Sequence, residues 1–254
     1  MPDTIDFSNL KDIERQSRQG EYGAWRKDYL ARFRPSLEGI YGEIRSRLRD
    51  NLASLGAEVS CGKGCALCCQ QFISIPVSHA LLITEYLYAS EPAMTTFKKG
   101  YARWRRAFEE NPQAEALLAR LETLTTMSAE VQLSPQPLLF DYHCLAVPCA
   151  FLDGKKCSIY PVRPIVCSAY YAVSPQQYCR ADSAVPAEIL EIRPGEDSLR
   201  KLSQLADPRL SWHQEPLAEI VYKLLTRGLP EVSEEVFRLF ESEERAQGNA
   251  HQGA

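Results

Sequence analysis

The 254-residue chain lacks several features that would point to a compartment or to a class of partner. No apolar run approaches the roughly 20 residues that a membrane-spanning helix needs. Residues 1–20 are polar and of mixed charge, without the apolar core of an export signal. We therefore expect a cytoplasmic protein with no membrane partner. Disulfides are rare in a reducing cytoplasm, and nine cysteines cannot all pair within one chain.

The chain also has little that would attract nucleotides or nucleic acids. Its net charge is −4, so no global field favours a polyanion, and it contains no glycine-rich phosphate loop or dinucleotide fingerprint. One basic segment, residues 97–108, carries lysines and arginines around an aromatic stripe. We interpret this segment as a solvated helix face over buried aromatic residues, and we expect no nucleic-acid partner.

Helical periodicity is abundant. Apolar residues recur at helical spacing through residues 21–55, where Pro35 predicts a break and Gly56 predicts the C-terminal end. Another helix is predicted to begin at Pro76, and His79 near its start is interpreted as a surface or capping residue. The stretch from Ser134 to Tyr142 has two prolines and little periodicity, which predicts a connector.

The cysteine-rich part of the chain has a different character. Residues 144–179 are rich in proline, tyrosine and turn residues, which predicts loops with a small hairpin at Asp153-Gly154. Such a region needs something besides apolar packing to order it, and bound metal would do this. We therefore predict a mainly α fold, in which a helical scaffold carries a loop-rich cysteine-cluster region stapled by metal.

Three segments are predicted from these changes in character. The first is an N-terminal helical segment, residues 1–56, and the last is a C-terminal helical segment, residues 181–254. Between them, residues 57–180 form a cysteine-cluster metal-binding domain that contains a helical insertion, residues 76–130.

The cysteines form two groups. Four of the nine lie within the nine residues from Cys61 to Cys69, and the others follow a gap of 74 residues. The later group consists of Cys144, Cys149, Cys157, Cys167 and Cys179. Thiolates are the ligands of four-sulfur zinc sites and of iron–sulfur clusters, so two groups joined by a helical insertion suggest one region assembled from both ends. Nine thiols exceed one such site, which leaves two metals, a binuclear site or spare cysteines open.

Both groups resemble the YkgJ-type cysteine-cluster family, which is described as a zinc- or iron-chelating domain. The first block is Cys61-x3-Cys65-x2-Cys68-Cys69, and the second runs from Pro148-Cys149-Ala150-Phe151-Leu152 through Cys157-Ser158-Ile159-Tyr160 and Arg163-Pro164 to Cys167. The resemblance implies seven metal ligands: Cys61, Cys65, Cys68, Cys69, Cys149, Cys157 and Cys167. Cys144 and Cys179 fall outside the pattern, and Ser168 stands where the family often has arginine.

The function predicted from these residues is metal binding, with zinc or iron as the cofactor and an iron–sulfur cluster as one form of the iron. One alternative is an iron–sulfur or radical-type oxidoreductase or transferase, since the first three cysteines have C-x3-C-x2-C spacing; however, Ala66 stands where radical enzymes tend to place an aromatic residue. Another is thiol–disulfide exchange at Cys68-Cys69. A third is a partner-binding module in which metal only staples the loops around Arg163-Pro164.

No nucleophile or acid–base pair stands out in the sequence, so whether the chain is an enzyme stays open. Asp141 and His143 lie close to Cys144 and are candidate metal ligands or proton donors. A protein partner of unknown kind also stays open.

Overall fold

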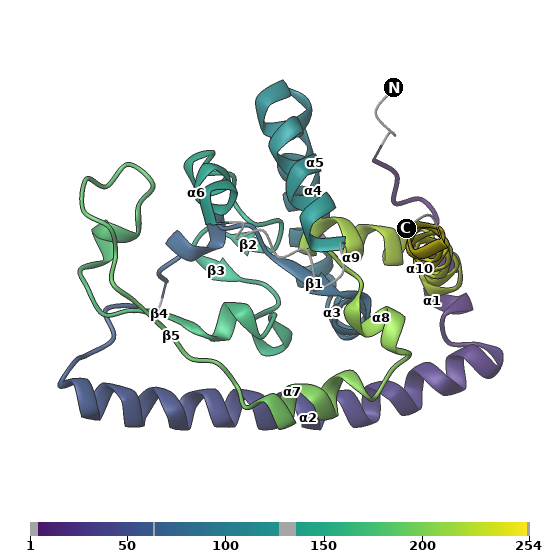
Figure 1. The fold of residues 1–254 in the computed structure, drawn as a ribbon, viewed down its shortest axis with the longest axis horizontal. Coiled ribbons are helices and arrows are strands. Elements are labelled where there is room, and N and C mark those ends of the chain that lie inside the picture. Colours follow the sequence, from purple (N-terminus) through teal and green to yellow (C-terminus); the bar gives the residue numbers. More distant parts are fainter. Residues whose placement is uncertain (1–4, 63, 127–135, 253–254) are drawn as a thin grey trace.

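The structure is a computed structural model that describes residues 5–62, 64–126 and 136–252 (Figure 1). It is mainly helical with a few short strands, which confirms the predicted fold class. The α-helices are α1 (Leu10–Gln16), α2 (Gly20–Leu55), α3 (Val77–Ala89), α4 (Glu91–Glu109), α5 (Pro112–Thr126), α6 (Gln136–Cys144), α7 (Glu196–Ser203), α8 (Pro208–Trp212), α9 (Leu217–Thr226) and α10 (Gly228–Gln252).

The strands pair two by two, and all three pairs are antiparallel. They are β1 (Ser74–Pro76) with β6 (Gln214–Pro216), β2 (Leu152–Asp153) with β3 (Lys156–Cys157), and β4 (Tyr170–Ala172) with β5 (Ile189–Glu191). Four short 3-10 helices complete the described elements: η1 (Leu67–Gln70), η3 (Tyr160–Val162), η4 (Val166–Ser168) and η5 (Gln176–Cys179).

Helix α2 is the longest element and runs along one edge of the molecule (Figure 1). It contains Pro35, so the predicted break at this residue is wrong. Proline removes one intrahelical hydrogen bond, but Phe33 and Leu37 are buried on either side of it and hold both halves of the helix against the core. Gly56 ends the helix in a left-handed conformation with φ +60°, as predicted.

The centre of the fold is built from two similar strand–helix units. In each unit a short strand ends in a proline, Pro76 or Pro216, that precedes the helix, α3 or α9. The Val77 N–H donates to the His213 carbonyl and the Leu217 N–H donates to the Ile73 carbonyl, so the two units are joined in the same way from both sides. Helix α3 also packs on α9. It is buried around most of its circumference, as expected of an apolar helix at the centre of a fold.

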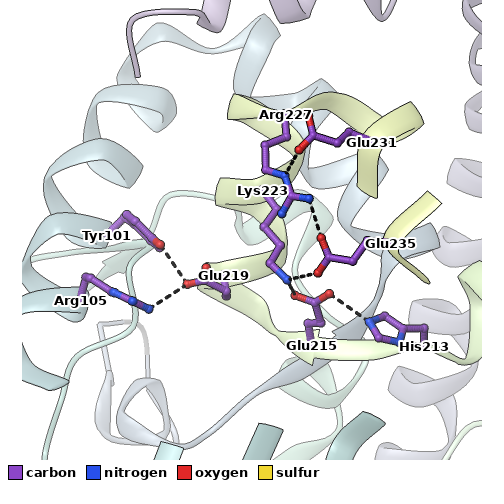
Figure 2. A network of polar contacts seen from close by, with 9 residues as sticks. All are labelled: Tyr101, Arg105, His213, Glu215, Glu219, Lys223, Arg227, Glu231 and Glu235. Carbon is purple, nitrogen blue, oxygen red and sulfur yellow. Dashed lines mark hydrogen bonds and ion pairs between the residues drawn. The ribbon is translucent and has the colours of Figure 1, made fainter. Parts of the chain in front are cut away.

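A polar network ties the C-terminal helices to the helical insertion (Figure 2). The buried Glu215 carboxylate lies 3.0 Å from His213 Nε2 and 2.8 Å from Lys223 Nζ. The same lysine contacts Glu235 of α10 at 3.0 Å. A separate set of contacts joins α9 to α4, since Glu219 accepts a 2.9 Å hydrogen bond from the Tyr101 hydroxyl.

Helix α4 buries its aromatic stripe, as predicted from the sequence. Phe97 is fully buried and stacks on Phe151 with ring centroids 4.8 Å apart. Gly100 lies directly against the backbone of the second cysteine block, because a Cβ atom there would sit 1.9 Å from the Ala150 carbonyl oxygen. The helical insertion is therefore in backbone contact with the cysteine region.

Residues 136–144 form helix α6, where the sequence predicts a connector. The reason is tertiary packing. Tyr142 is buried, its hydroxyl accepts a 3.0 Å hydrogen bond from Trp104 Nε1, and its ring stacks on Phe108. The end of the predicted insertion, residues 127–130, lies outside the described residues.

One hydrophobic core cluster draws on residues from all three predicted segments, from Leu10 to Val236. Within the part of the chain that the structure describes, no helix has the length and apolar character needed to span a bilayer.

Candidate metal centre

The two cysteine blocks lie side by side, although 79 residues separate Cys69 from Cys149 in the sequence. The Cys149 N–H donates a 2.7 Å hydrogen bond to the Cys69 carbonyl. A second connection joins Cys61 to β4, since the Ala172 N–H lies 3.2 Å from the Cys61 sulfur. The fold therefore brings both blocks into one region, which is what a site assembled from both ends requires.

The first block is made of turns rather than a continuous helix. The Cys65 N–H donates to the Gly62 carbonyl at 3.0 Å, and Gly64 has φ +88°, a left-handed conformation that favours glycine. Only the last residues are helical, in η1, which carries Cys68 and Cys69. On this last turn the thiols of Cys68 and Cys69 are hydrogen-bonded to each other.

In the second block, Cys149 precedes a hairpin, Cys157 lies on it and Cys167 lies in a 3-10 turn, and Cys179 follows in another turn outside the block. Strands β2 and β3 form the predicted hairpin, in which Leu152 pairs with Cys157 and Gly154 adopts φ +57°. Cys167 lies in η4 and Cys179 ends η5. This last turn is held to the first block by Gln176, whose Nε2 donates a 2.7 Å hydrogen bond to the Ser60 carbonyl.

The thiols fall into two neighbourhoods that meet at Cys68. The pKa of Cys179 is raised by burial and then by the nearby thiols of Cys61, Cys65 and Cys68. In the second neighbourhood, the pKa of Cys69 is raised by its hydrogen bond with Cys68 and by burial, and then by the nearby thiols of Cys68, Cys149 and Cys157. The same two thiols, after burial, raise the pKa of Cys167.

Burial raises the pKa of thiols in both neighbourhoods, those of Cys61 and Cys179 included. It raises the pKa of Cys149 to about 12 and that of Cys167 well above the usual value, so both are protonated thiols at neutral pH when no metal is bound. By contrast, the pKa of the exposed Cys68 is lowered to about 7, because Cys69 donates a hydrogen bond to its sulfur and Arg163 adds positive charge. Cys68 is therefore the thiol most ready to ligate a metal or to react.

Arg163 links the cysteine region to the scaffold. Its Nε donates a 2.8 Å hydrogen bond to the Ser168 hydroxyl, its guanidinium lies 4.1 Å above the Tyr160 ring, and its carbonyl accepts a hydrogen bond from Tyr41 of α2. Its charge also favours the thiolate of Cys157. Ser168, to which the sequence assigned no role, thus positions the arginine, and only the folded geometry reveals this.

The polar candidates near Cys144 lie at the edge of this region. His143 Nε2 is 3.1 Å from the Cys179 carbonyl oxygen, and its Nδ1 is buried with no partner among the described residues. Asp141 and Cys144 are exposed on α6. His143 therefore contacts the backbone that carries a thiol.

The donor set fits zinc or iron by its chemistry, since it consists of free thiols with a neighbouring positive charge. In the described ranges, however, no three cysteine, histidine or carboxylate side chains form a group that could hold a metal ion as they stand. The thiols are gathered into one region without being closed into a coordination shell, and a bound ion would have to draw the sulfur atoms together.

Comparison with known proteins identifies the family. No curated protein and no solved structure matches the chain. One family model does match, over residues 60–186, and it is described as "CxxCxxCC: putative zinc- or iron-chelating domain". The match covers half of the chain and includes both cysteine blocks, which confirms the resemblance seen in the sequence. The chain therefore belongs to the CxxCxxCC family of zinc- or iron-chelating domains.

Proposed function

We propose that the chain binds two metal centres, each held by four thiolates. The outer set consists of Cys61, Cys65, Cys68 and Cys179. The inner set consists of Cys69, Cys149, Cys157 and Cys167. This division follows the electrostatic neighbours of Cys61, Cys179 and Cys167; Cys68 acts on thiols of both sets and is assigned to the outer one because it is exposed. Each centre then has the four sulfur ligands that structural zinc sites and iron–sulfur clusters use.

The observation that carries the division is the position of Cys69. Its carbonyl accepts the 2.7 Å hydrogen bond from the Cys149 N–H, so its backbone is joined to the second block. The adjacent Cys68 is exposed, and its thiol influences Cys61 and Cys179 as well as the inner thiols of Cys149, Cys157 and Cys167. Two neighbouring cysteines would thus contribute to different centres, and the hydrogen bond between their sulfur atoms would be lost when metal binds.

The two centres have different proposed roles. The inner set is partly buried and joins the 3-10 turn η1, the hairpin β2–β3 and η4, which are segments with little apolar packing of their own. Metal there would staple the loops together. The outer set includes the exposed Cys61 and Cys68, so the thiol of a partner would be able to displace one of these ligands, a step that a closed four-thiolate site needs before any chemistry at the ion. We infer that the outer centre performs the function and that the inner centre supports it.

This assignment extends the seven cysteines expected from the sequence by one. Cys179 completes the outer set, and Cys144 is left as an exposed, unligated thiol. Two four-thiolate centres need eight sulfurs, and the first block supplies only three to the outer set once Cys69 belongs to the inner one. Cys179 is chosen as the fourth because its thiol is influenced by those of Cys61, Cys65 and Cys68.

Metal analysis of protein purified without oxygen tests the proposal. We expect two zinc ions per chain, or two iron–sulfur clusters with their visible absorption. Cys179→Ser should lose one centre and keep the other, whereas Cys144→Ser, the matched control, should keep both. A chain that contains neither zinc nor iron would overturn the proposal, and so would equal metal loss in the two variants.

The same sample tests the radical-type alternative. If the outer centre holds an iron–sulfur cluster that cleaves S-adenosylmethionine, the reduced protein should release 5′-deoxyadenosine, and Cys61→Ser should abolish the release. An iron-containing protein that leaves S-adenosylmethionine intact excludes this reaction and retains metal binding.

A further inference from the structure

A half-open cavity of about 320 Å³ lies beside the cysteine region, near the start of α3. This volume is at the lower end of the range for small-molecule sites, about 300–1,000 Å³. Its wall combines β1 and the start of α3 with the segment before Cys167 and with α7 and α8. The lining residues that matter here are Phe33, His79, Ile165, Leu199, Leu202 and Ser211.

His79 is the group in this wall that lacks a partner. Its side chain is 4% exposed, so the interpretation of His79 as a surface residue is wrong. The reason is that α3 is surrounded by core on most sides. Nε2 has no hydrogen-bond partner among the described residues, while the Val162 carbonyl accepts a hydrogen bond from the ring. The proton therefore sits on Nδ1, and the lone pair of Nε2 is buried within the wall, so a ligand in the cavity must move part of the wall to reach it.

The protonation state of this histidine is fixed by its surroundings. Burial lowers the pKa of His79 to about 4, so the ring is neutral at physiological pH. A buried acceptor without a partner is costly, which makes it a natural anchor for a ligand that brings a donor.

Two hydroxyl groups of the wall already have partners. The Ser211 hydroxyl donates a 2.8 Å hydrogen bond to the Ser203 carbonyl, and the Ser74 hydroxyl donates to Gln214 at 3.1 Å. Among the described residues that line the cavity, none carries a formal charge. The remaining wall is largely aliphatic and aromatic, which suits an apolar body and gives a charged ligand no ion-pair partner.

We propose that this cavity binds a small, uncharged organic molecule whose hydroxyl or N–H group donates a hydrogen bond to His79 Nε2 and whose apolar body packs on Phe33, Ile165 and Leu202. The proposal does not depend on the metal centres, because none of its contacts is made by a cysteine.

Three probes of similar shape test the chemistry of the site in the full-length protein. They are phenol, which has a donor; toluene, which has none; and benzoate, which is charged. Binding is followed by NMR of histidine-labelled protein, through the His79 ring nitrogens. We expect phenol to shift the Nε2 resonance and to bind about fivefold to tenfold more tightly than toluene, the effect of one hydrogen bond.

Variants locate the binding. His79→Phe keeps an aromatic ring without the acceptor, so it should bind phenol and toluene equally. Leu199→Trp should fill the cavity and abolish phenol binding, whereas Leu239→Trp on α10 is the matched control, because these leucines are 39% and 43% exposed. Tighter binding of benzoate than of phenol, an unchanged Nε2 resonance, or equal phenol binding by both tryptophan variants would overturn the proposal. The two tryptophan variants change partly exposed positions, so the test does not depend on His79→Phe folding.

Discussion

The helical scaffold and the cysteine region are held together in different ways. In the scaffold, side chains such as Tyr29, Phe33 and Phe97 are 0–2% exposed and pack into one continuous core. The cysteine region has strands of two or three residues, short 3-10 turns and thiols that are exposed or half-buried. Apolar burial therefore stabilises the scaffold throughout. The cysteine region adds a few buried side chains such as Phe151 and Val162 to this core, and its thiol-bearing strands and turns depend on backbone hydrogen bonds and, under the proposal above, on sulfur ligation.

The largest loss of stability in the scaffold should come from Phe97→Ala. Phe97 is fully buried and stacks on Phe151, so its loss should lower the free energy of unfolding by about 3–5 kcal/mol. Denaturant unfolding followed by circular dichroism measures the change. Leu239→Ala, at an exposed position of α10, should stay within about 0.5 kcal/mol of the parent. Equal effects of the two substitutions would contradict a scaffold stabilised by burial.

Removal of bound metal should loosen the cysteine region and leave the helical scaffold intact. After chelation, we expect amide hydrogen exchange at Cys149 and Ala172 to accelerate about a hundredfold, which corresponds to the loss of about 2.7 kcal/mol of local stabilisation. Amides of α3 and α9 should keep their protection, because their packing does not involve the thiols. If chelation instead unfolds the helices to the same extent, the two regions are not separable.

Gly100 tests the contact between the regions. In Gly100→Ala the new Cβ would lie 1.9 Å from the Ala150 carbonyl oxygen, so α4 or the cysteine region must shift, at a cost of about 1–3 kcal/mol. Metal content should fall as well, since Ala150 follows Cys149. Gly39→Ala in α2 is the matched control: no atom lies within 4 Å of the position that its new methyl group would take, and it should be neutral or stabilising by up to about 1 kcal/mol. Full metal content in Gly100→Ala would show that the contact does not position the thiols.

The smallest effect concerns pH and is confined to the scaffold. Burial acts to raise the pKa of Glu215, but the hydrogen bond from His213 and the charge of Lys223 outweigh it, so the folded-state pKa is lowered. A lowered pKa stabilises the folded state above the unfolded value, near 4.3, and this stabilisation is lost as pH falls through the folded value. Glu215→Gln should cost about 1 kcal/mol at pH 7.

Urea unfolding at pH 7 and pH 3 measures this difference. The stability gap between the parent and Glu215→Gln should narrow at the lower pH. A gap that stays constant would mean that the carboxylate charge contributes nothing to the network in Figure 2.

Features governed by neighbouring residues could be predicted from the sequence. Gly56 ends α2, Gly154 turns the hairpin, and the Asn111 side chain accepts hydrogen bonds from the Gln113 and Ala114 amides at the start of α5. These positions depend on local backbone preference. The adjacency of the two cysteine blocks was also expected, because thiolate chemistry requires several sulfurs in one place.

Features governed by distant contacts could not be predicted in this way. The pairing of β1 with β6 joins residues 140 positions apart, as in the hydrogen bond from Ser74 to Gln214. Helix α6 depends on the packing of Tyr142, and the continuity of α2 through Pro35 depends on the core. The burial of His79 likewise follows from how α3 is surrounded. The identity of the thiol ligands and the division into three segments stay predictions.

The two joined strand–helix units extend beyond the residues that the family model matches. The family match ends at residue 186, yet β6 and α9, which complete the hydrogen bonding of β1 and the packing of α3, begin at residue 214. The stretch that the family model matches is therefore narrower than the set of elements that pack together at the centre of the fold. A chain ended at residue 186 would keep every cysteine but would lose β6 and α9, which would leave one side of α3 facing water. The stability of the matched residues therefore depends on residues that follow them.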